Sequence, residues 1–284
     1  MKLAIVANIK KEGTKTVLPR FLELLPKEHF EAVFHEDLRR ILGENYTYRP
    51  EKSLFNDADM IVSFGGDGTI LYTARISENT GIPILGVNLG KVGFLAEISP
   101  EEIDIIPKKL IDGDFEILER MAFSAKTSSG NHYFALNDIA IDRNIDTRIL
   151  RLTVSVDSQF AGEIHADGLI ISTPTGSTAH SMAAGGPLVM PECRVMVLTP
   201  ICPHSLTIRP MIVDSSKEVR LVVAEGLARM AVDGQSFVDI PEGSKVSIKT
   251  AGKPVRITRF RDKTYFDILH TRLRWGTSLK LKNA

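Results

Sequence analysis

One turn constrains the fold of this chain more than any other feature. The segment Gly65-Gly66-Asp67-Gly68-Thr69 follows an apolar run, 58–64, that is typical of a buried strand, and precedes a run, 70–75, that can begin a helix. Glycine permits backbone angles closed to other residues and lets a ligand approach the main chain. The free N–H groups at a helix start attract phosphate. We therefore expect a phosphate-binding turn, with Gly65, Gly66 and Thr69 as its candidate ligands.

The carboxylate of Asp67 has two possible roles in such a turn. An acid in a phosphate-binding loop suggests chemistry on a phosphorylated nucleotide. Alternatively, Asp67 could simply cap the following helix, since aspartate is favoured at helix starts. The turn is neither a Walker P-loop, because no Gly-Lys-Ser/Thr follows, nor the Gly-x-Gly-x-x-Gly dinucleotide fingerprint.

The first third of the chain alternates between strand and helix patterns. Expected strands are 3–8, 31–35, 58–64 and 82–88, and expected helices are 14–25, 37–42, 70–79 and 100–110. This rhythm predicts a parallel sheet with helices on both faces, and ligands of such sheets lie outside the carboxyl ends of the strands.

After Gly113 the pattern changes to short strands separated by turns, without helices between most of them. That pattern predicts a β-sandwich. We expect an α/β Rossmann-like domain over 1–114, completed by a C-terminal helix in 261–284, and an all-β domain over 115–260. The expected strands of the second domain are 115–126, 132–142, 150–157, 160–164, 169–172, 194–199, 218–224, 227–232, 245–250 and 255–260.

Composition restricts the possible partners. Among 284 residues, Lys plus Arg and Asp plus Glu both number 35, so a general electrostatic surface for nucleic acid or membrane is not expected. No apolar run approaches the roughly 20 residues that span a bilayer. The only cysteines are Cys193 and Cys202, which we expect to be buried thiols in a reducing compartment. The first residues resemble a strand and not a signal peptide, which predicts a cytoplasmic protein.

A second glycine-rich segment, 86–94, follows the strand that is expected next to the first turn. It presents backbone N–H groups, Asn88 and Lys91, and a flexible turn is the alternative interpretation. Neighbouring parallel strands end at the same edge, so this segment and the first turn could form two sides of one cleft. Lys91 and Arg75 are candidates for binding phosphate charge, although either could be a solvated surface residue.

Two further segments carry polar groups where a fold alone would not require them. The stretch from Asp167 to Pro187 is dense in hydroxyls and glycines, so its side chains and main chain could bind a nucleotide. Asn137 and Asp138 interrupt an apolar pattern that indicates a strand, where both residue types are disfavoured. A β-turn is the plain alternative, but such a mismatch is typical of a functional position.

Together these segments resemble the NAD kinase family, and the resemblance extends over essentially the whole chain. It rests on Gly65–Thr69, Asn137-Asp138 and 173–187, with support from 86–95, 198–206 and Asp233-Gly234-Gln235. The first motif alone is shared with diacylglycerol-type lipid kinases and, in similar form, with phosphofructokinases. A lipid or sugar kinase is therefore the rival enzyme, and a non-catalytic NAD(P) sensor is the rival of another class.

The resemblance implies transfer of the γ-phosphate of ATP to the 2′-hydroxyl of the adenosine ribose of NAD, which gives NADP. Asp67 would orient that hydroxyl and accept its proton. ATP would be the phosphoryl donor, with a divalent ion, Mg²⁺ by preference, that few dedicated protein ligands hold. The family is usually oligomeric, so a homodimer or homotetramer is expected.

The resemblance also implies the residues that bind NAD. Asp138 would contact ribose hydroxyls, Asp167 the nicotinamide end, and Thr178, Ala179 and His180 the adenine. The full set of expected NAD-binding residues is Asp67, Gly68, Asn137, Asp138, Arg148, His165, Asp167, Thr178, Ala179, His180, Ser181, Met182, Ala183 and Gln235. The family usually has tyrosine at the position of His180 and often serine at that of Ala183, so the packing against the adenine is expected to differ here.

Overall fold

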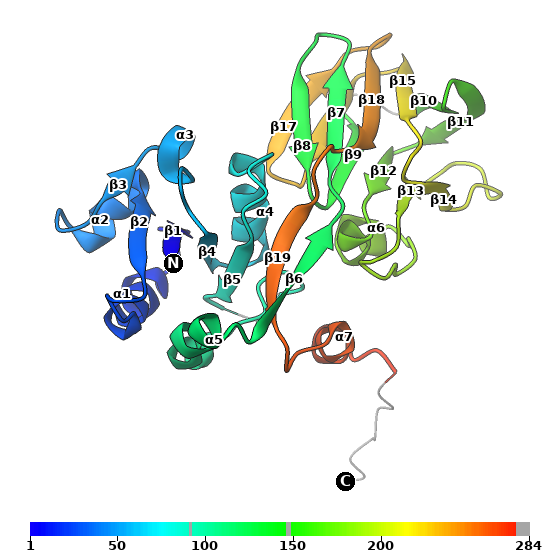
Figure 1. Cartoon of the computed structure of the whole chain (residues 1–284). Helices are drawn as coiled ribbons and strands as arrows, with labels where there is room; N and C mark the ends of the chain where they lie inside the picture. Colours follow the sequence, from blue (N-terminus) through cyan, green and yellow to red (C-terminus); the bar gives the residue numbers. More distant parts are fainter. Residues whose placement is uncertain (91–92, 146–148, 277–284) are drawn as a thin grey trace. The chain divides into compact units, whose positions relative to one another are not determined.

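The computed structural model describes residues 1–90, 93–145 and 149–276, and they form two compact units. The first comprises Met1–Leu118 and the segment that begins at Arg256, and the second comprises Glu119–Val255. Both joins lie within five residues of those expected from the sequence. Each unit has its own sheets and its own core (Figure 1).

The first unit is built on one seven-stranded sheet. Each of the five strands β3, β2, β1, β4 and β5 runs parallel to its neighbour, as does β19 next to β5. In sheet order the strands are β3 Tyr48–Arg49, β2 Glu31–His35, β1 Lys2–Ala7, β4 Met60–Gly65, β5 Ile84–Asn88, β19 Val255–Phe260 and β6 Phe115–Arg120.

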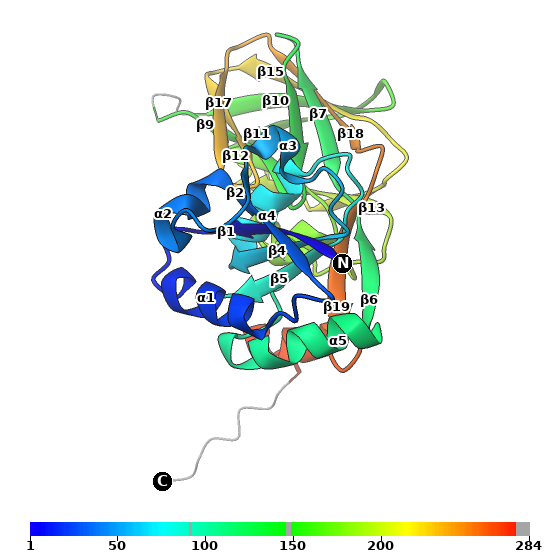
Figure 2. The same cartoon turned by 60° about the vertical axis from the view of Figure 1, so that its left-hand side comes forward.

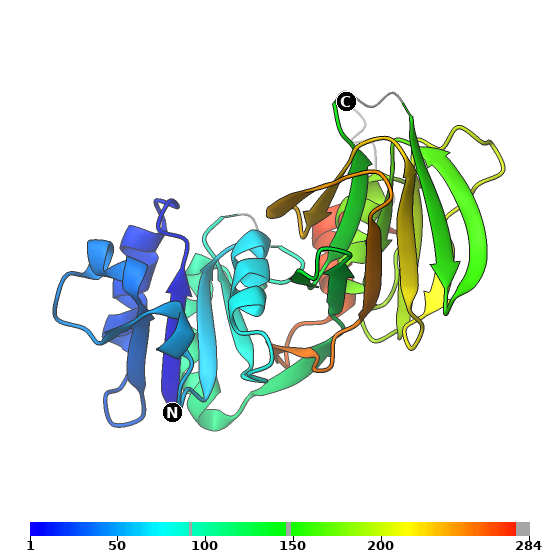
Figure 3. The same ribbon diagram turned by 90° about the horizontal axis from the view of Figure 1, so that it is seen from above.

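Helices cover both faces of this sheet because its central strands are apolar on both faces, as parallel sheets require. Leu18 of α1 and Ile106 of α5 share one core with Leu3 and Val62, and Figure 2 shows α1 and α5 side by side. On the opposite face α4, which Figure 3 shows in cyan beside the strands, packs through a bond of 2.9 Å between Ser63 Oγ and Thr73 Oγ1. The helices of this unit are α1 Thr14–Leu24, η1 Glu36–Leu38, α2 Arg39–Leu42, α3 Glu51–Leu54, α4 Asp67–Ile76, η2 Pro100–Ile105, α5 Ile106–Asp112 and α7 Tyr265–Leu273.

The second unit is a sandwich of two six-stranded antiparallel sheets, which confirms the expected fold class. One core joins them, with Phe123 and Leu152 from one sheet and Ile139 and Ile171 from the other. The first sheet is β11 Gln159–Ala166, β10 Leu150–Val156, β15 Val219–Glu225, β18 Lys245–Thr250, β7 Phe123–Thr127 and β8 His132–Ala135. The second is β14 Met211–Asp214, β13 Val195–Ile201, β12 Gly168–Ser172, β9 Asp138–Arg143, β16 Ala228–Val232 and β17 Ser236–Ile240. Two short helices, η3 Thr175–Thr178 and α6 His180–Ala183, follow β12.

Three expectations about this architecture are wrong. The runs 115–126 and 132–142 are not single strands, because each changes sheets midway, at Met121-Ala122 and at Leu136-Asn137. The strands β6 and β19, expected in the second domain, lie in the sheet of the first unit. The two cysteines are exposed free thiols, since they lie in the loops on either side of β13 and not in a core.

Candidate active site

The Gly65–Thr69 turn has the predicted strand-to-helix geometry. β4 ends at Gly65, and α4 begins at Asp67 after Gly66 in extended conformation. A Cβ on Gly65 would lie 1.9 Å from Thr69 Oγ1, so only glycine lets the strand end lie against the first turn of the helix. The amide of Thr69 donates to the Gly66 carbonyl at 2.8 Å, which closes that turn.

The carboxylate of Asp67 is held by the second glycine-rich segment. Oδ2 accepts the N–H of Phe94 at 2.8 Å, and Oδ1 accepts those of Leu95 and Ala96, each at 3.0 Å. A Cβ on Gly93 would lie 1.8 Å from Oδ1, so a glycine is required there for this contact. The N-cap residue of α4 is Gly66, and the Asp67 carboxylate bonds residues 94–96 outside its own helix, so the capping role considered for Asp67 is wrong.

The Asp67 carboxylate can accept one more hydrogen bond in this arrangement. A carboxylate has about four lone-pair sites, and these three bonds occupy two on Oδ1 and one on Oδ2. Oδ2 can accept a further hydrogen bond while the other three keep the group in place. A pre-positioned acceptor of this kind is suited to orient a substrate hydroxyl.

Asn88 of β5 braces the same segment. It is 1% exposed, its Oδ1 accepts the Gly90 N–H at 2.9 Å, and its Nδ2 donates to the Ala96 carbonyl at 3.4 Å. Asn88 therefore shapes the loop that holds Asp67. The two glycine arrays do meet at the carboxyl ends of adjacent strands, as the sequence predicts.

The structure does not bring Arg75, one of the two basic residues expected at this turn, to it. Arg75 lies in the last turn of α4, about 12 Å along the helix axis from Asp67, with its guanidinium carbon 5.6 Å from the centre of the Tyr72 ring. Lys91 lies outside the described residues. Among the described residues, Lys11 does reach the turn, where its Nζ donates to the Gly65 carbonyl at 2.8 Å. Nothing in the sequence distinguishes Lys11 from its neighbour Lys10.

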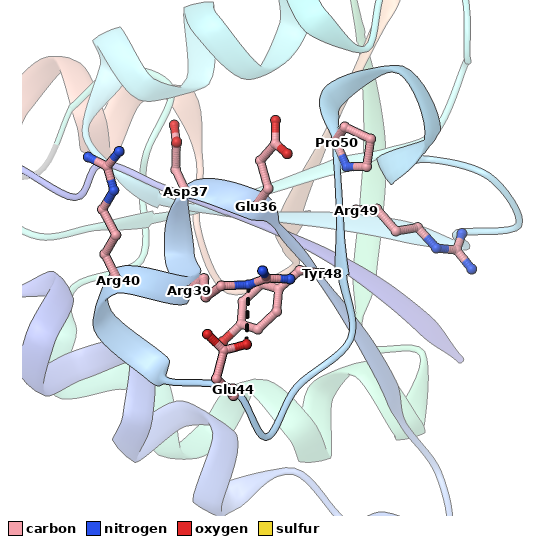
Figure 4. A pocket seen from close by; sticks show the side chains of 8 residues that line it. All are labelled: Glu36, Asp37, Arg39, Arg40, Glu44, Tyr48, Arg49 and Pro50. Carbon is pink, nitrogen blue, oxygen red and sulfur yellow. Dashed lines mark ion pairs between the residues drawn. The ribbon is translucent and has the colours of Figure 1, made fainter.

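A surface hollow of about 620 Å³ also lies in the first unit, after the ends of β2 and β3 (Figure 4). Two of its arginines have partners nearby. Arg39 Nε is 3.6 Å from Glu44 Oε2, and Arg49 Nη1 donates to the Asn56 carbonyl at 3.1 Å. The hollow contains no residue that the sequence singles out, and we assign it no ligand. Its lining is Glu36, Asp37, Arg39, Arg40, Glu44, Tyr48, Arg49 and Pro50.

In the second unit, the turn at Asn137 is held by another carboxylate. Asp233 accepts the N–H groups of Leu136, Asn137 and Asp138 at 2.9, 2.7 and 3.1 Å. These bonds satisfy the main chain where it passes from β8 in one sheet to β9 in the other. Asp233 belongs to a motif that the sequence shows, but no feature of the sequence predicts this role.

The segment 173–187 comes directly against this turn. The N–H of Thr173 donates to the Asn137 carbonyl at 2.8 Å, and its hydroxyl donates to the Leu136 carbonyl at 2.7 Å. A Cβ on Gly176 would lie 2.0 Å from the Asn137 carbonyl oxygen, so the close approach requires glycine. Asn137 and the segment 173–187 are thus brought together.

The hydroxyls of that segment are turned into the protein and not presented to a ligand. Ser177 Oγ donates to the Pro174 carbonyl at 2.7 Å, and Ser181 Oγ lies 2.8 Å from Thr199 Oγ1, with both residues fully buried. The expectation of side-chain binding through these hydroxyls is therefore not supported for Ser177 and Ser181. Thr178 is also buried, Ala179 and Met182 are half-buried, and His180 and Ala183 are exposed.

Asp138 is 4% exposed, and its environment is unfavourable for a charge. Burial, followed by the negative charges of Asp233 and Asp142, raises the pKa of Asp138 to about 7. Burial also raises the pKa of Asp142, against which the nearby His180 acts in the opposite direction. The unit thus gathers three carboxyl groups and one imidazole around β9.

Three further expected NAD-binding residues, Asp167, His165 and Gln235, occupy more exposed positions. Asp167 Oδ1 accepts from Arg143 Nε at 2.8 Å, and His165 Nε2 lies 2.9 Å from Glu163 Oε1. Gln235 is exposed in the turn between β16 and β17. Arg148 lies outside the described residues.

Comparison with known proteins decides what these features belong to. The model of the ATP-NAD kinase N-terminal domain matches residues 3–115, and that of the ATP-NAD kinase C-terminal domain matches residues 136–260. The chain belongs to the ATP-NAD kinase family. It is 36% identical over 286 residues to the NAD kinase of Moorella thermoacetica, covering 98% of this chain and 90% of the relative. To that of Sulfurimonas denitrificans it is 38% identical over 278 residues, covering 97% of both chains.

Solved structures agree with this membership. An NAD kinase from Archaeoglobus fulgidus, crystallised in complex with ATP, matches with a TM-score of 0.78 at 28% identity, covering 96% of this chain and 99% of that one. Yeast NADH kinase, crystallised with NADH, matches with a TM-score of 0.91 at 24% identity, covering 100% and 90%, and supports the fold. The resemblance inferred from the sequence motifs is confirmed.

Proposed function

We propose that this ATP-NAD kinase phosphorylates the 2′-hydroxyl of the adenosine ribose of NAD with Asp67 as its base. Family membership supports the reaction itself, ATP plus NAD giving ADP plus NADP. The observation that carries the role of Asp67 is that the three successive backbone N–H groups of residues 94–96 hold its carboxylate at the start of α4. That grip fixes the carboxylate and leaves Oδ2 able to accept a hydroxyl.

The reaction then follows from positioning and charge. The 2′-oxygen attacks the γ-phosphorus, the bond from that phosphorus to the bridging oxygen breaks, and its electron pair leaves with ADP. The hydroxyl proton passes to Asp67. In a loose phosphoryl-transfer transition state little basicity is needed, so a well-placed carboxylate suffices. The positive dipole end at the start of α4 would attract the phosphates to this turn.

The second unit would supply the NAD-binding groups. Asn137 and Asp138, set by Asp233, would bind ribose hydroxyls, with Asp167 towards the nicotinamide end. His180 and Ala183, both exposed, would present the adenine surface through the segment that begins at Thr178. Because the hydroxyl of Ser181 bonds Thr199, Ser181 would contribute through its main chain.

A divalent ion would arrive as part of the substrate, on the phosphates of ATP. Among the described residues, no three His, Cys, Asp or Glu side chains are grouped so that they could hold a metal. Mg²⁺ on the phosphates lowers their charge, and the protein residues named above act on that complex.

Two wider expectations accompany the function. In the part of the chain that the structure describes, no helix has the length and apolar character of a membrane span. We propose that the enzyme acts in the cytoplasm as a homodimer or homotetramer. Light scattering of the purified protein and fractionation of the cells that make it would test these two points.

The deciding experiment is an assay of the purified protein with NAD, ATP and Mg²⁺, with NADP as the measured product. We expect NADP formation that depends on all three. A folded protein that binds NAD and forms no NADP would contradict the kinase function and favour a non-catalytic NAD(P) sensor.

A further inference from the structure

The parallel sheet of the first unit has a topological switch point between β1 and β4. From β1 the chain goes to β2 on one side, and the later strands β4 and β5 lie on the other side. In open parallel sheets, ligands bind outside the carboxyl ends of the strands at such a point. The loops that leave β1 and β4 are therefore the ones that a ligand would meet first.

One side chain of the loop after β1, that of Lys11, reaches the end of β4. Lys11 Nζ donates to the carbonyl of Gly65, the last residue of β4, at 2.8 Å. The same carbonyl accepts the N–H of Leu89 from the end of β5 at 2.7 Å. A Cβ on Gly66 would lie 3.1 Å from Nζ, and one on Gly90 would lie 3.6 Å away. The ammonium thus lies between the two glycine arrays that surround Asp67.

The position of Lys11 is set by its own loop. The N–H of Lys11 donates to the Asn8 carbonyl at 3.1 Å, and that of Thr14 donates to the Lys11 carbonyl at 3.0 Å. The hydroxyl of Thr14, a residue that is 0% exposed, donates to the Asn8 carbonyl at 2.6 Å. Lys11 therefore extends from an ordered turn, whereas the adjacent Lys10 is exposed.

Lys11 differs from two other partly buried lysines in the kind of group that it contacts. Lys109 contacts Asp114 and Asp262, and Lys263 contacts Glu102. Among the described residues, no carboxylate forms an ion pair with Lys11, whose bonded partner is a neutral carbonyl. An ammonium has three donors, so Lys11 can make further bonds beside the one to Gly65. A half-buried cation without a counter-charge is costly, and an anionic ligand would offset that cost.

We propose that Lys11 binds a phosphate oxygen of ATP, and so is a catalytic residue that stabilises negative charge on the phosphates during transfer. The proposal rests on the proposed function for the choice of ATP. The ammonium serves as a point charge, as lysines do in other phosphate sites, and takes no part in proton transfer. The bond to Gly65 holds the Lys11 ammonium next to the turn that contains Asp67.

The test measures binding of a non-hydrolysable ATP analogue by calorimetry, with Mg²⁺ present and NAD absent. Lys11→Met removes both the charge and the bond to Gly65. Lys11→Gln removes the charge but retains an N–H₂ that can donate to that carbonyl. We expect both variants to bind the analogue about tenfold to a hundredfold more weakly, the size of a charged hydrogen bond. Lys11→Arg should recover most of the affinity, and the control Lys10→Met should stay within about twofold of the wild type.

Two outcomes would overturn the proposal. If Lys11→Gln binds the analogue as the wild type does, Lys11 serves only to hydrogen-bond the Gly65 carbonyl. The same conclusion follows if the Lys11 variants lose NAD affinity in the same proportion as analogue affinity, because the loss then reflects the fold. The result is separate from turnover: a wild-type protein that forms no NADP, yet binds the analogue through Lys11, would refute the proposed function and leave this inference standing.

Discussion

Asp67 in the first unit and Asp233 in the second are held by the same device. Each carboxylate accepts three successive backbone N–H groups, those of Phe94–Ala96 and those of Leu136–Asp138, at 2.7–3.1 Å. The purpose differs. At Asp67 the loop holds the acid at a helix start, where a substrate can meet it. At Asp233 the acid holds the loop, and the residues it positions are the proposed ligands.

The difference teaches that one hydrogen-bonding pattern can serve a reacting group or a scaffold. What distinguishes the two is the surrounding structure: a strand end with two glycine arrays and Lys11 at Asp67, and a change of sheet beside a buried carboxyl at Asp233. Substitutions at the two sites should therefore affect different kinetic parameters, although they remove the same kind of contact.

The largest effect is expected for Asp67→Asn. The amide has a similar shape but cannot take a proton, so kcat should fall about a thousandfold, in the range of general-base contributions. The NAD dissociation constant should change only a few-fold. Steady-state kinetics together with NAD titration would show this, and a kcat within tenfold of the wild type would refute the role of Asp67 as base.

The paired variants Gly93→Ala and Gly176→Ala come next. A methyl at Gly93 would lie 1.8 Å from Asp67 Oδ1, so it displaces the base and should lower kcat by about tenfold to a hundredfold. A methyl at Gly176 would lie 2.0 Å from the Asn137 carbonyl and should mainly raise the KM for NAD.

Matched controls exist for both variants. A Cβ at Gly13 meets its nearest neighbour at 3.5 Å, and one at Gly252 meets nothing within 4 Å, so alanine at either position should leave both parameters near wild type. If Gly93→Ala and Gly176→Ala changed kcat and KM in the same way, the distinction between the two regions would fail.

A smaller effect is expected for Asp233→Asn. One amide oxygen cannot serve all three N–H groups, so at least one loses its partner, at a cost of about 2 kcal/mol in the free energy of unfolding. The turn at Asn137 should loosen and the KM for NAD should rise about tenfold, with kcat changed less. Chemical denaturation and kinetics of the same sample would measure both. A thousandfold loss of kcat, as expected for Asp67→Asn, would contradict a scaffold role.

The smallest effect concerns pH and Asp138. The pKa of this carboxyl is raised to about 7. Between about pH 4 and pH 7 the Asp138 carboxyl is therefore protonated in the folded protein and ionised in the unfolded chain. The contribution of Asp138 to stability should thus decline from about pH 4 to about pH 7 and stay low above that. The ionised form accepts ribose hydroxyls better, so the KM for NAD should fall a few-fold between pH 6 and pH 8.

Asp138→Asn provides the comparison for both trends. The variant should lack this pH dependence of KM and should unfold with a higher free energy than the wild type at pH 8. Stability curves at pH 5 and pH 8 would measure the second effect. A variant with the same pH dependence as the wild type would assign the titration to another group.

Local pattern was enough to predict much of the first unit. The apolar runs and glycine turns located β1, β2, β4 and β5, and parallel neighbours must end at one edge, so the meeting of the two glycine arrays followed. The prediction that 115–126 and 132–142 are single strands was wrong because the chain passes from one sheet to another without interrupting its apolar pattern. The β period continues across the break while the hydrogen-bonding partners change.

Residue type, order and spacing by themselves determined the family, the fold class and the identity of the acid at the turn, because glycine, aspartate and strand periodicity have local physical meanings. Only the tertiary structure decided which groups surround that acid. Lys11 and not Arg75 lies at the turn, Asp233 holds the N–H of Asn137, and the hydroxyls of Ser177 and Ser181 face inward. The contacts of Lys11, Asp233 and Ser181 join residues 18 to 96 positions apart, and their geometry depends on strand order and packing, which no local pattern encodes.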